Sequence, residues 1–197
     1  MRKIVVISMI TLDGVLQGPG GPGEDTSNGF AYGGWTAGFG DEVFAERFAT
    51  QMRPAELLLG RRTFDIFEAF WPEHADGWPG INEATKYVVS ETRDAADWSN
   101  SVFLHGLPAV KALRESDGPE LHVWGSGRLI QALLENDLVD ELRLTIFPVT
   151  IGEGKRLFDG GAIPAAFSLA ECVGTPSGLI MANYERAGEL KLGTVGD

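Results

Sequence analysis

The sequence predicts an α/β fold in which a central mixed sheet is flanked by helices and followed by a C-terminal β-hairpin. Short, almost wholly apolar runs alternate with segments whose apolar residues recur at helical spacing, as expected of strands joined by helices. Two of the strand-to-helix junctions pass through glycine. Beyond residue 147, two apolar segments flank the turn 174–178, whose glycines and proline favour a hairpin.

Each element follows from its local pattern. The first strand contains almost only apolar residues, so we expect it to be buried on both faces. The first helix is expected to start at Asp41, to align Phe44 and Phe48 on one face, and to end at Pro54. The strand at 140–149 alternates apolar and polar residues and is expected to be half exposed. Strands are expected at 3–9, 57–59, 86–90, 102–104, 121–124, 140–149, 167–173 and 179–184, and the later helices near residues 64, 108 and 128.

Length and charge limit the classes of protein that fit. The chain has 197 residues, 44% of them hydrophobic, which suffices for one substantial core. Because neither a repeat nor a linker is visible, we expect a single domain at 1–186 and a loose tail at 187–197. The formal net charge of −12 argues against nucleic-acid binding, which needs a basic face. It does not exclude a small anionic ligand, because a few local cations can outweigh the global field.

The sequence indicates neither a membrane-spanning segment nor a metal site. No apolar run is long enough to span a membrane, and the run at 4–7 is interpreted as a buried strand instead of a signal peptide. Cys172 is the single cysteine, so an internal disulfide and a cysteine metal cluster are excluded. The three histidines are scattered, and no spacing is typical of a metal site. We therefore expect a cytoplasmic protein without a metal ion.

The two glycine-rich junctions are candidate phosphate sites. The segment Gly125-Ser126-Gly127 leads straight into a predicted helix, where open backbone N–H groups can bind an anion. It is interpreted either as a phosphate cradle or as an ordinary tight turn. The junction at 60–63 carries Arg61 and Arg62, which fit a phosphate clamp because guanidinium binds phosphate through two hydrogen bonds. The alternative is that both arginines are simply exposed.

Two further segments allow more than one interpretation. The loop that begins at Gln17 and Gly18 is dense in glycine and proline, and it is either a mobile lid or a surface excursion. In the irregular segment that follows, Trp35 either anchors the loop to the core or lines a ligand pocket. Asp13, at the end of the first strand, either takes part in catalysis or stabilises a turn.

Five segments, in order, match the motifs of one known family: ISMITLDG at 7–14, LLLGRRTF at 57–64, YVVS at 87–90, WGSGRL at 124–129 and DELRLT at 140–145. On these segments the chain resembles the dihydrofolate reductase superfamily, whose three-layer fold we therefore expect. It is most similar to the branch that includes the C-terminal reductase domain of bacterial riboflavin biosynthesis. The resemblance runs from residue 3 to about residue 186.

The resemblance implies NADPH as the cofactor, held at the glycine junctions and covered by the loop that follows the first strand. Arginines beside the ribose favour NADP over NAD, because an acidic residue there would repel the additional phosphate. By this resemblance, the 2′-phosphate and the adjoining pyrophosphate bind Gly60, Arg61, Arg62 and Thr63. The adenosine phosphate end lies by Ser90 and Thr92, and the loop at Gln17 and Gly18 covers the nicotinamide. The pyrophosphate binds the start of the helix at Gly125, Ser126, Gly127, Arg128 and Leu129.

The implied activity is hydride transfer to a small pterin-like or pyrimidine-like heterocycle lying against Asp13, Trp35 and Thr145. The carboxylate that true dihydrofolate reductases carry on the first helix falls near Phe44 here, so folate is not the expected substrate. The proton would come from Asp13 or from an acid of the 41–46 segment, with a pKa raised by burial.

A second hypothesis is a nucleotide-binding protein of the same fold without reductase activity. By analogy with the family we also expect a homodimer, with the strand at 140–149 and the final hairpin as candidate interfaces.

Overall fold

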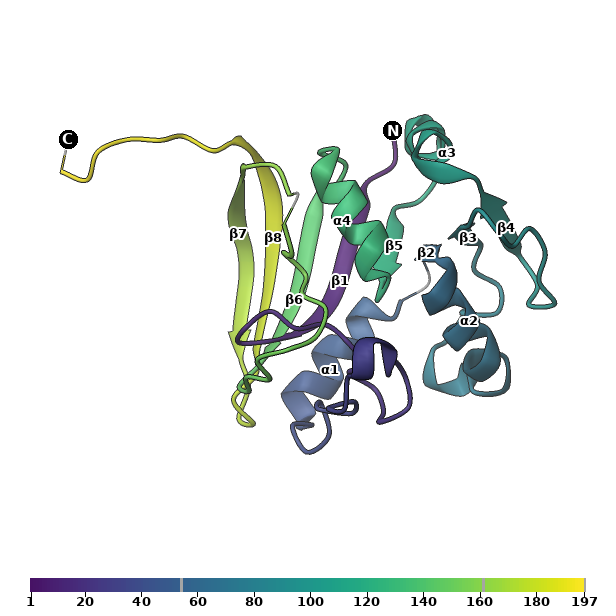
Figure 1. Ribbon diagram of the computed structural model, residues 1–197, viewed down its shortest axis with the longest axis horizontal. Helices are drawn as coiled ribbons and strands as arrows, with labels where there is room; N and C mark the ends of the chain where they lie inside the picture. The colour runs from purple at the N-terminus through teal and green to yellow at the C-terminus, as the bar shows by residue number, and fades with distance from the viewer. Residues whose placement is uncertain (54, 161, 197) are drawn as a thin grey trace.

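The computed structural model describes residues 1–53, 55–160 and 162–196, and within them eight strands form one sheet (Figure 1). The strands are β1 (Ile4–Thr11), β2 (Glu56–Gly60), β3 (Lys86–Val89), β4 (Ser101–Leu104), β5 (Leu121–Trp124), β6 (Glu141–Phe147), β7 (Ala165–Gly174) and β8 (Ile180–Glu189). Their order is β4-β3-β2-β5-β1-β6-β8-β7. The strands from β4 to β6 run parallel, whereas β8 is antiparallel to both β6 and β7.

Helices cover both faces of this sheet. They are α1 (Glu42–Gln51), α2 (Arg61–Phe70), α3 (Gly106–Glu115) and α4 (Gly127–Glu135). Successive residues of a strand point to opposite faces, so β1 contributes to two cores. Val6 belongs to the core with Ile130 of α4, and Val5 belongs to the core with Phe64 of α2. The predicted α/β class, with a mixed sheet between helices, a buried first strand and a final hairpin, is confirmed. Pro54, the predicted end of the first helix, lies outside the described residues.

Strand β6 is more buried than its alternating sequence predicts. Leu142 and Leu144 are buried on one face as expected, but Glu141 and Thr145 on the other face are buried as well. The reason is the position of β6 between β1 and β8, with α1 packed over its second face. The prediction of a half-exposed strand was wrong because sequence alternation alone does not show which helix lies in front of the strand.

The C-terminal hairpin is longer than its apolar pattern predicts. Strands β7 and β8 have 10 residues each, and β8 continues to Glu189. The first three residues of the predicted tail at 187–197 therefore belong to the sheet. Residues 190–196 leave the sheet, and Leu192 and Val195 are fully exposed there (Figure 1). No helix in the described part of the chain is long and apolar enough to cross a membrane.

Candidate functional site

The sheet has a switch point at its carboxyl end, here called the crevice, where the chain leaves β2 and β5 toward opposite faces. Strand β2 leads into α2 on one face, and its neighbour β5 leads into α4 on the other. In open α/β sheets, ligands bind at such a switch point, outside the carboxyl ends of the strands. Because β2 and β5 are neighbours, the topology places the glycine junctions at 60–63 and 125–127 next to each other.

Hydrogen bonds lock these two junctions together. Ser126 Oγ accepts a hydrogen bond from the Gly60 amide at 2.9 Å, and Thr63 Oγ1 accepts one from the Ser126 amide at 2.8 Å. Gly125 has a φ of +53°, and a Cβ atom at this position would lie 3.0 Å from Thr63 Oγ1. Glycine is needed at 125 because the backbone is left-handed there and the second junction is in contact with it.

Neither of the two helices that start at the crevice has a side-chain cap. Gly60, at the N-cap of α2, has no side chain, and Ser126, at the N-cap of α4, uses its hydroxyl to accept from Gly60 instead of capping its own helix. The first-turn N–H groups have no acceptor within the helix, and the helix dipole makes this end electropositive. Two such helix starts beside one crevice suit a ligand that carries two phosphates.

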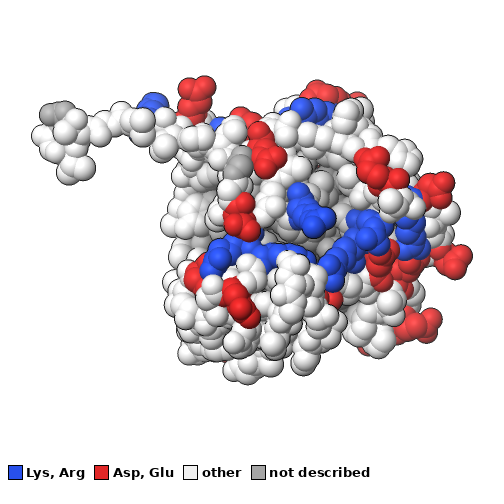
Figure 2. Space-filling view, viewed as in Figure 1, with Lys and Arg blue, Asp and Glu red and all other residues white. Residues whose placement is uncertain are grey.

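The arginines at the junctions differ in their availability. Arg61 pairs with Asp65, and Arg62 pairs with Asp25 at 2.8 Å. Arg128, exposed in the first turn of α4, has no carboxylate partner among the described residues. Figure 2 shows a band of lysine and arginine side chains across one face of this acidic protein. A phosphate could therefore bind Arg128 directly, whereas it would have to displace Asp25 from Arg62.

Ser90 and Thr92 lie in the turn after β3. Ser90 Oγ accepts hydrogen bonds from the amides of Thr92 at 3.2 Å and Arg93 at 2.8 Å, so this hydroxyl shapes its own turn. Thr92 is exposed. Arg93 pairs with Asp65, which also holds Arg61. The turn is thus linked to the start of α2 through Arg93. Ser90 has a structural role as an acceptor, and its predicted phosphate contact, which would use the O–H as donor, stays a prediction.

Gln17 fastens the loop that follows β1. Its side chain is 2% exposed; Nε2 donates to two backbone carbonyls of the segment 25–27 at 3.0 and 3.1 Å, and Oε1 accepts from the Lys155 amide at 3.0 Å. The side chain of Gln17 is therefore turned into the loop, and the coverage of the nicotinamide by the loop at Gln17 and Gly18 stays a prediction. The residue that touches the glycine junction is Leu16, whose Cδ1 lies 3.2 Å from the place of a Cβ atom at Gly127.

Trp35 anchors the same loop. Its Nε1 donates to the Gln17 carbonyl at 2.8 Å, and its ring packs edge-on against Phe147 with centroids 5.2 Å apart. The Gly34 amide donates to the Gly18 carbonyl at 2.8 Å, which closes the two sides of the loop on each other. This geometry favours the anchoring interpretation of Trp35, because its single N–H group is already in use; its place against the substrate stays a prediction.

Asp13 stabilises a turn and is unsuited to donate a proton. Its carboxylate accepts hydrogen bonds from Thr11 Oγ1 at 2.6 Å and from the amides of Ile151 at 3.2 Å and Gly152 at 2.7 Å. The hydrogen bond from Thr11, together with those from the amides, outweighs partial burial and lowers the pKa of Asp13 to about 2. The carboxyl group is thus ionised at neutral pH, which favours the turn-stabilising interpretation of Asp13 over a role as proton donor; its catalytic role stays a prediction.

The acids of the 41–46 segment are not placed for proton transfer either. Asp41 caps α1 by accepting from the Phe44 amide at 2.8 Å, and hydrogen bonds from Ser177 and Phe44 hold the pKa of Asp41 well below its usual range. Glu42 and Glu46 are exposed. Among the described residues, no group of three histidine, cysteine, aspartate or glutamate side chains is arranged to hold a metal ion.

Thr145 and Trp124 lie on the α1 side of the sheet, near the crevice. Thr145 is 2% exposed and stands opposite Met9 of β1. Trp124, directly before the junction at 125–127, packs edge-on against Phe48 with centroids 5.7 Å apart. Its buried Nε1 has no hydrogen-bond partner in the described part of the chain, which is rare for a buried N–H group. Trp124 is a candidate substrate contact that the sequence analysis missed, although its place before the glycine pair was a signal.

The sheet, the crevice and the paired junctions define the class of protein: an α/β domain suited to a phosphate-bearing ligand at the carboxyl end of its sheet. The chain belongs to the RibD C-terminal domain family, whose family model matches residues 2–181. The predicted resemblance to the reductase-like riboflavin branch of the dihydrofolate reductase superfamily is thereby confirmed.

Two relatives from Bacillus subtilis (strain 168) are similar in sequence. The uncharacterised protein YyaP is 30% identical over 165 residues, which is 80% of each chain. The uncharacterised protein YwjB is 25% identical over 159 residues, covering 80% of this chain and 83% of the relative.

Two solved structures are similar in fold. One, from Shewanella sp. PV-4, is described provisionally as a riboflavin biosynthesis protein; it has a TM-score of 0.68 and 22% identity over 95% of this chain and 99% of its own. The other is a pyrimidine reductase-like protein from Corynebacterium diphtheriae, with a TM-score of 0.60 and 14% identity over 95% of this chain and 93% of its own. They confirm the predicted three-layer, dihydrofolate reductase-like fold.

Proposed function

We propose that this protein is an NADPH-dependent reductase that transfers a hydride to a small pyrimidine-like or pterin-like heterocycle. The observation that carries the proposal is the pair of uncapped helix starts, α2 and α4, joined by Ser126 across the crevice between β2 and β5. Membership in the reductase-like RibD C-terminal domain family supports the proposal. So does the fold shared with a protein described as pyrimidine reductase-like.

The residues at the crevice fit NADPH. The first-turn amides at 127–129 would bind the pyrophosphate, since the glycine at 125 leaves the backbone open to close approach. Arg128 would add a positive charge to the same group. Arg61 and Arg62 would bind the 2′-phosphate that distinguishes NADPH from NADH, because guanidinium matches phosphate geometry. When bound, NADPH supplies the hydride, and the protein supplies orientation and exclusion of water.

The acceptor is assigned to the α1 side of the sheet, against Trp124, Thr145 and Phe48. The unpaired Nε1 of Trp124 would donate a hydrogen bond to a carbonyl or ring nitrogen of the heterocycle and so fix its orientation. Phe48 would pack against the ring. Because the carboxylate of Asp13 is held ionised, we assign the proton that accompanies the hydride to water.

A nucleotide-binding protein without reductase activity is the second candidate. One observation favours it: Asp13 and Asp41, the acids that the sequence offered as proton donors, both have lowered pKa values. A reductase that relies on its own carboxyl group would need a pKa near neutrality.

The cofactor assignment is tested by titrating NADPH and NADH into four proteins and measuring Kd by calorimetry. Removing charge-assisted hydrogen bonds worth about 1.5–3 kcal/mol should make the Arg61→Ala/Arg62→Ala double variant bind NADPH at least about tenfold more weakly, with little change for NADH. Arg128→Ala should weaken both nucleotides alike, because both carry the pyrophosphate. Lys111→Ala, an exposed change on α3, is the control. Equal losses of both nucleotides in the double variant would refute the 2′-phosphate clamp.

The activity is tested by following NADPH oxidation with a panel of pterins, pyrimidines and carbonyl compounds. The reductase proposal expects turnover with at least one of the heterocycles, and Trp124→Phe should slow it while sparing NADPH affinity. Tight NADPH binding without oxidation by any compound would favour the second candidate.

A cytoplasmic location and a homodimer stay predictions. The edge strand β7 offers an exposed Leu169 to a second copy, and light scattering coupled to size exclusion would measure the mass.

A further inference from the structure

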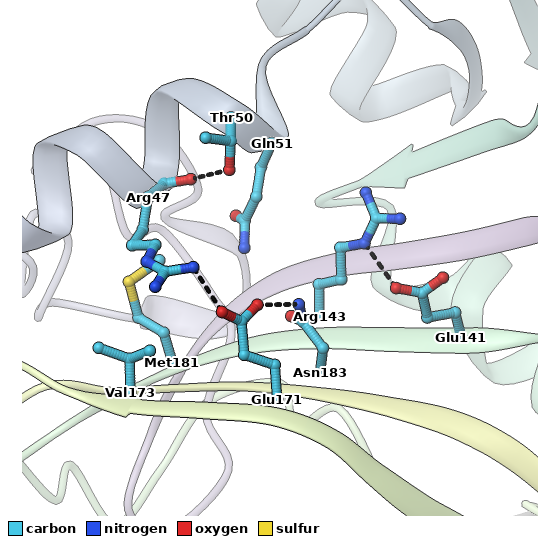
Figure 3. Close-up of a pocket in the computed structure, with 9 residues that line it drawn as sticks. All are labelled: Arg47, Thr50, Gln51, Glu141, Arg143, Glu171, Val173, Met181 and Asn183. Atoms are coloured by element: carbon cyan, nitrogen blue, oxygen red, sulfur yellow. Dashed lines mark hydrogen bonds and ion pairs between the residues drawn. The ribbon is translucent and has the colours of Figure 1, made fainter.

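A pocket lies under the C-terminal half of α1, between that helix and the sheet. Its volume is about 140 Å³, which equals roughly four or five water molecules at about 30 Å³ each. Arg47 and Gln51 of α1 form one wall, and Arg143 of β6, Asn183 of β8 and Glu171 of β7 form the other (Figure 3). The three strand residues stand opposite one another in register.

Gln51 is the unexplained group in this pocket. It is only 7% exposed, and Figure 3 shows its side chain reaching from the last turn of α1 into the gap above the strands. Its Oε1 is buried and has no hydrogen-bond partner among the described residues. A buried amide oxygen without a partner destabilises a fold, so a polar residue on the buried face of α1 indicates a partner from outside the chain.

Arg143 keeps hydrogen-bonding capacity for a ligand. Its side chain is 19% exposed; Nε donates to Glu141 at 2.7 Å, and a terminal nitrogen lies 3.6 Å from Glu120. The second distance is too long for a hydrogen bond, so the terminal N–H groups remain available. A largely buried guanidinium fork of this kind matches a carboxylate, which it can bind through two parallel hydrogen bonds.

The other charged groups are already fixed by one another. Arg47 pairs with Glu171, which also accepts a hydrogen bond from the side-chain Nδ2 of Asn183 at 3.2 Å. Among the residues that line the pocket, the two carboxylates of Glu141 and Glu171 stand against the two guanidinium groups of Arg47 and Arg143. The lining is therefore balanced in charge, which disfavours a purely anionic or purely cationic ligand and favours one that carries both charges.

We propose that this pocket binds a small amino acid, that is, a compact molecule with one carboxylate and one ammonium group. Arg143 would bind the carboxylate, and Gln51 Oε1 would accept a hydrogen bond from the ammonium group, so that the ligand, like the lining, carries no net charge. The site is separate from the glycine junctions and does not depend on the proposed reductase activity.

Calorimetry on the full chain tests the proposal with glycine, L-alanine, L-serine and L-asparagine as probes. Acetate and ethylamine, which each carry only one of the two groups, are the comparison compounds. At least one amino acid should bind at least tenfold more tightly than either of them. Gln51→Leu and Arg143→Lys should each weaken that binding at least tenfold. Gln131→Leu, a change of the same kind on α4, should leave it unaltered.

The melting temperature of unliganded Gln51→Leu separates a binding role from a structural one. If the Gln51 amide has no partner until a ligand binds, leucine removes an unpaired polar group at little change in size, so the variant should melt at the same temperature or higher. A clearly lower melting temperature would show that Gln51 is satisfied without a ligand, and it would overturn the proposal. Binding of acetate as tightly as the amino acids, or no binding of any probe at millimolar concentration, would overturn it too.

Discussion

The free N–H groups at the start of α1 are capped by a side chain, whereas those at the starts of α2 and α4 are not. Asp41 closes α1, because its carboxylate accepts from the Phe44 amide and from both the amide and the hydroxyl of Ser177. Helices α2 and α4 have no side-chain cap, and the two hydroxyls at hand, those of Ser126 and Thr63, join the two junctions instead. The difference teaches that this chain can close a helix end with its own side chains. Because α3 also starts without a side-chain cap, the feature that marks α2 and α4 as candidates for a ligand is that their two open ends are joined at neighbouring strands.

Among the variants that test this comparison, Gly125→Ala is expected to change stability and NADPH affinity most. The left-handed backbone makes a side chain cost about 1 kcal/mol or more, and the new Cβ would press on Thr63 Oγ1. We expect a lower melting temperature and a loss of NADPH affinity of more than about tenfold, because the crevice must widen. Gly188→Ala is the matched control, since Gly188 also has a positive φ of +97° but has open space around it. Equal NADPH affinities of the two variants would break the comparison.

A smaller effect, confined to stability, is expected from Asp41→Ala. The variant loses the cap of α1 and its contacts with Ser177, so thermal unfolding should shift to lower temperature. NADPH affinity measured by calorimetry should stay that of the wild type, because α1 takes no part in the proposed phosphate site. A variant that keeps its melting temperature but loses NADPH would contradict the division between closed and open helix ends.

The smallest effect is expected from Asp13→Asn, since asparagine keeps one oxygen acceptor for the turn. The folded-state pKa of about 2 lies below the usual value of 3.8, so the ionised form stabilises the fold above about pH 4. This stabilisation, about 1 kcal/mol after solvent screening, is lost as the pH falls from about 4 to about 2. Denaturant unfolding across this range should show a steeper loss for the wild type than for the variant. Turnover at neutral pH should be unchanged; a strong loss of turnover would restore Asp13 to the mechanism.

The fold could be predicted because its signals are local. Each apolar run and each glycine junction is contained in a few residues, and the alternation of strands and helices then limits the topology. The burial of β6 could not be read in this way, because it depends on α1, a segment about a hundred residues away in the chain. The length of β8 was underestimated because the polar residues Glu185, Arg186 and Glu189 interrupt the apolar pattern at its end.

The candidate site could be predicted only at positions whose role depends on the backbone, that is, on its conformation and its free N–H groups. The glycines at 125 and 127 and the helix start they open were found from sequence because side chains are excluded there. Asp13 stayed ambiguous because the amides that bind it, at 151 and 152, are distant in sequence. Arg62 was taken as available because its partner Asp25 lies in an irregular loop. Gln51 did leave a signal: it is a polar residue three positions after Phe48, on the face that the helix buries.

The ion pair between Arg62 and Asp25 affects how the affinity for NADPH would depend on ionic strength. Asp25 also holds Lys155 at 2.6 Å, so a nucleotide that takes Arg62 would replace one anion by another and leave Asp25 neutralised by the lysine. Such an exchange adds little new attraction between opposite charges. NADPH affinity should therefore fall less steeply with added salt than the number of arginines around the crevice suggests, and Asp25→Asn should make it steeper.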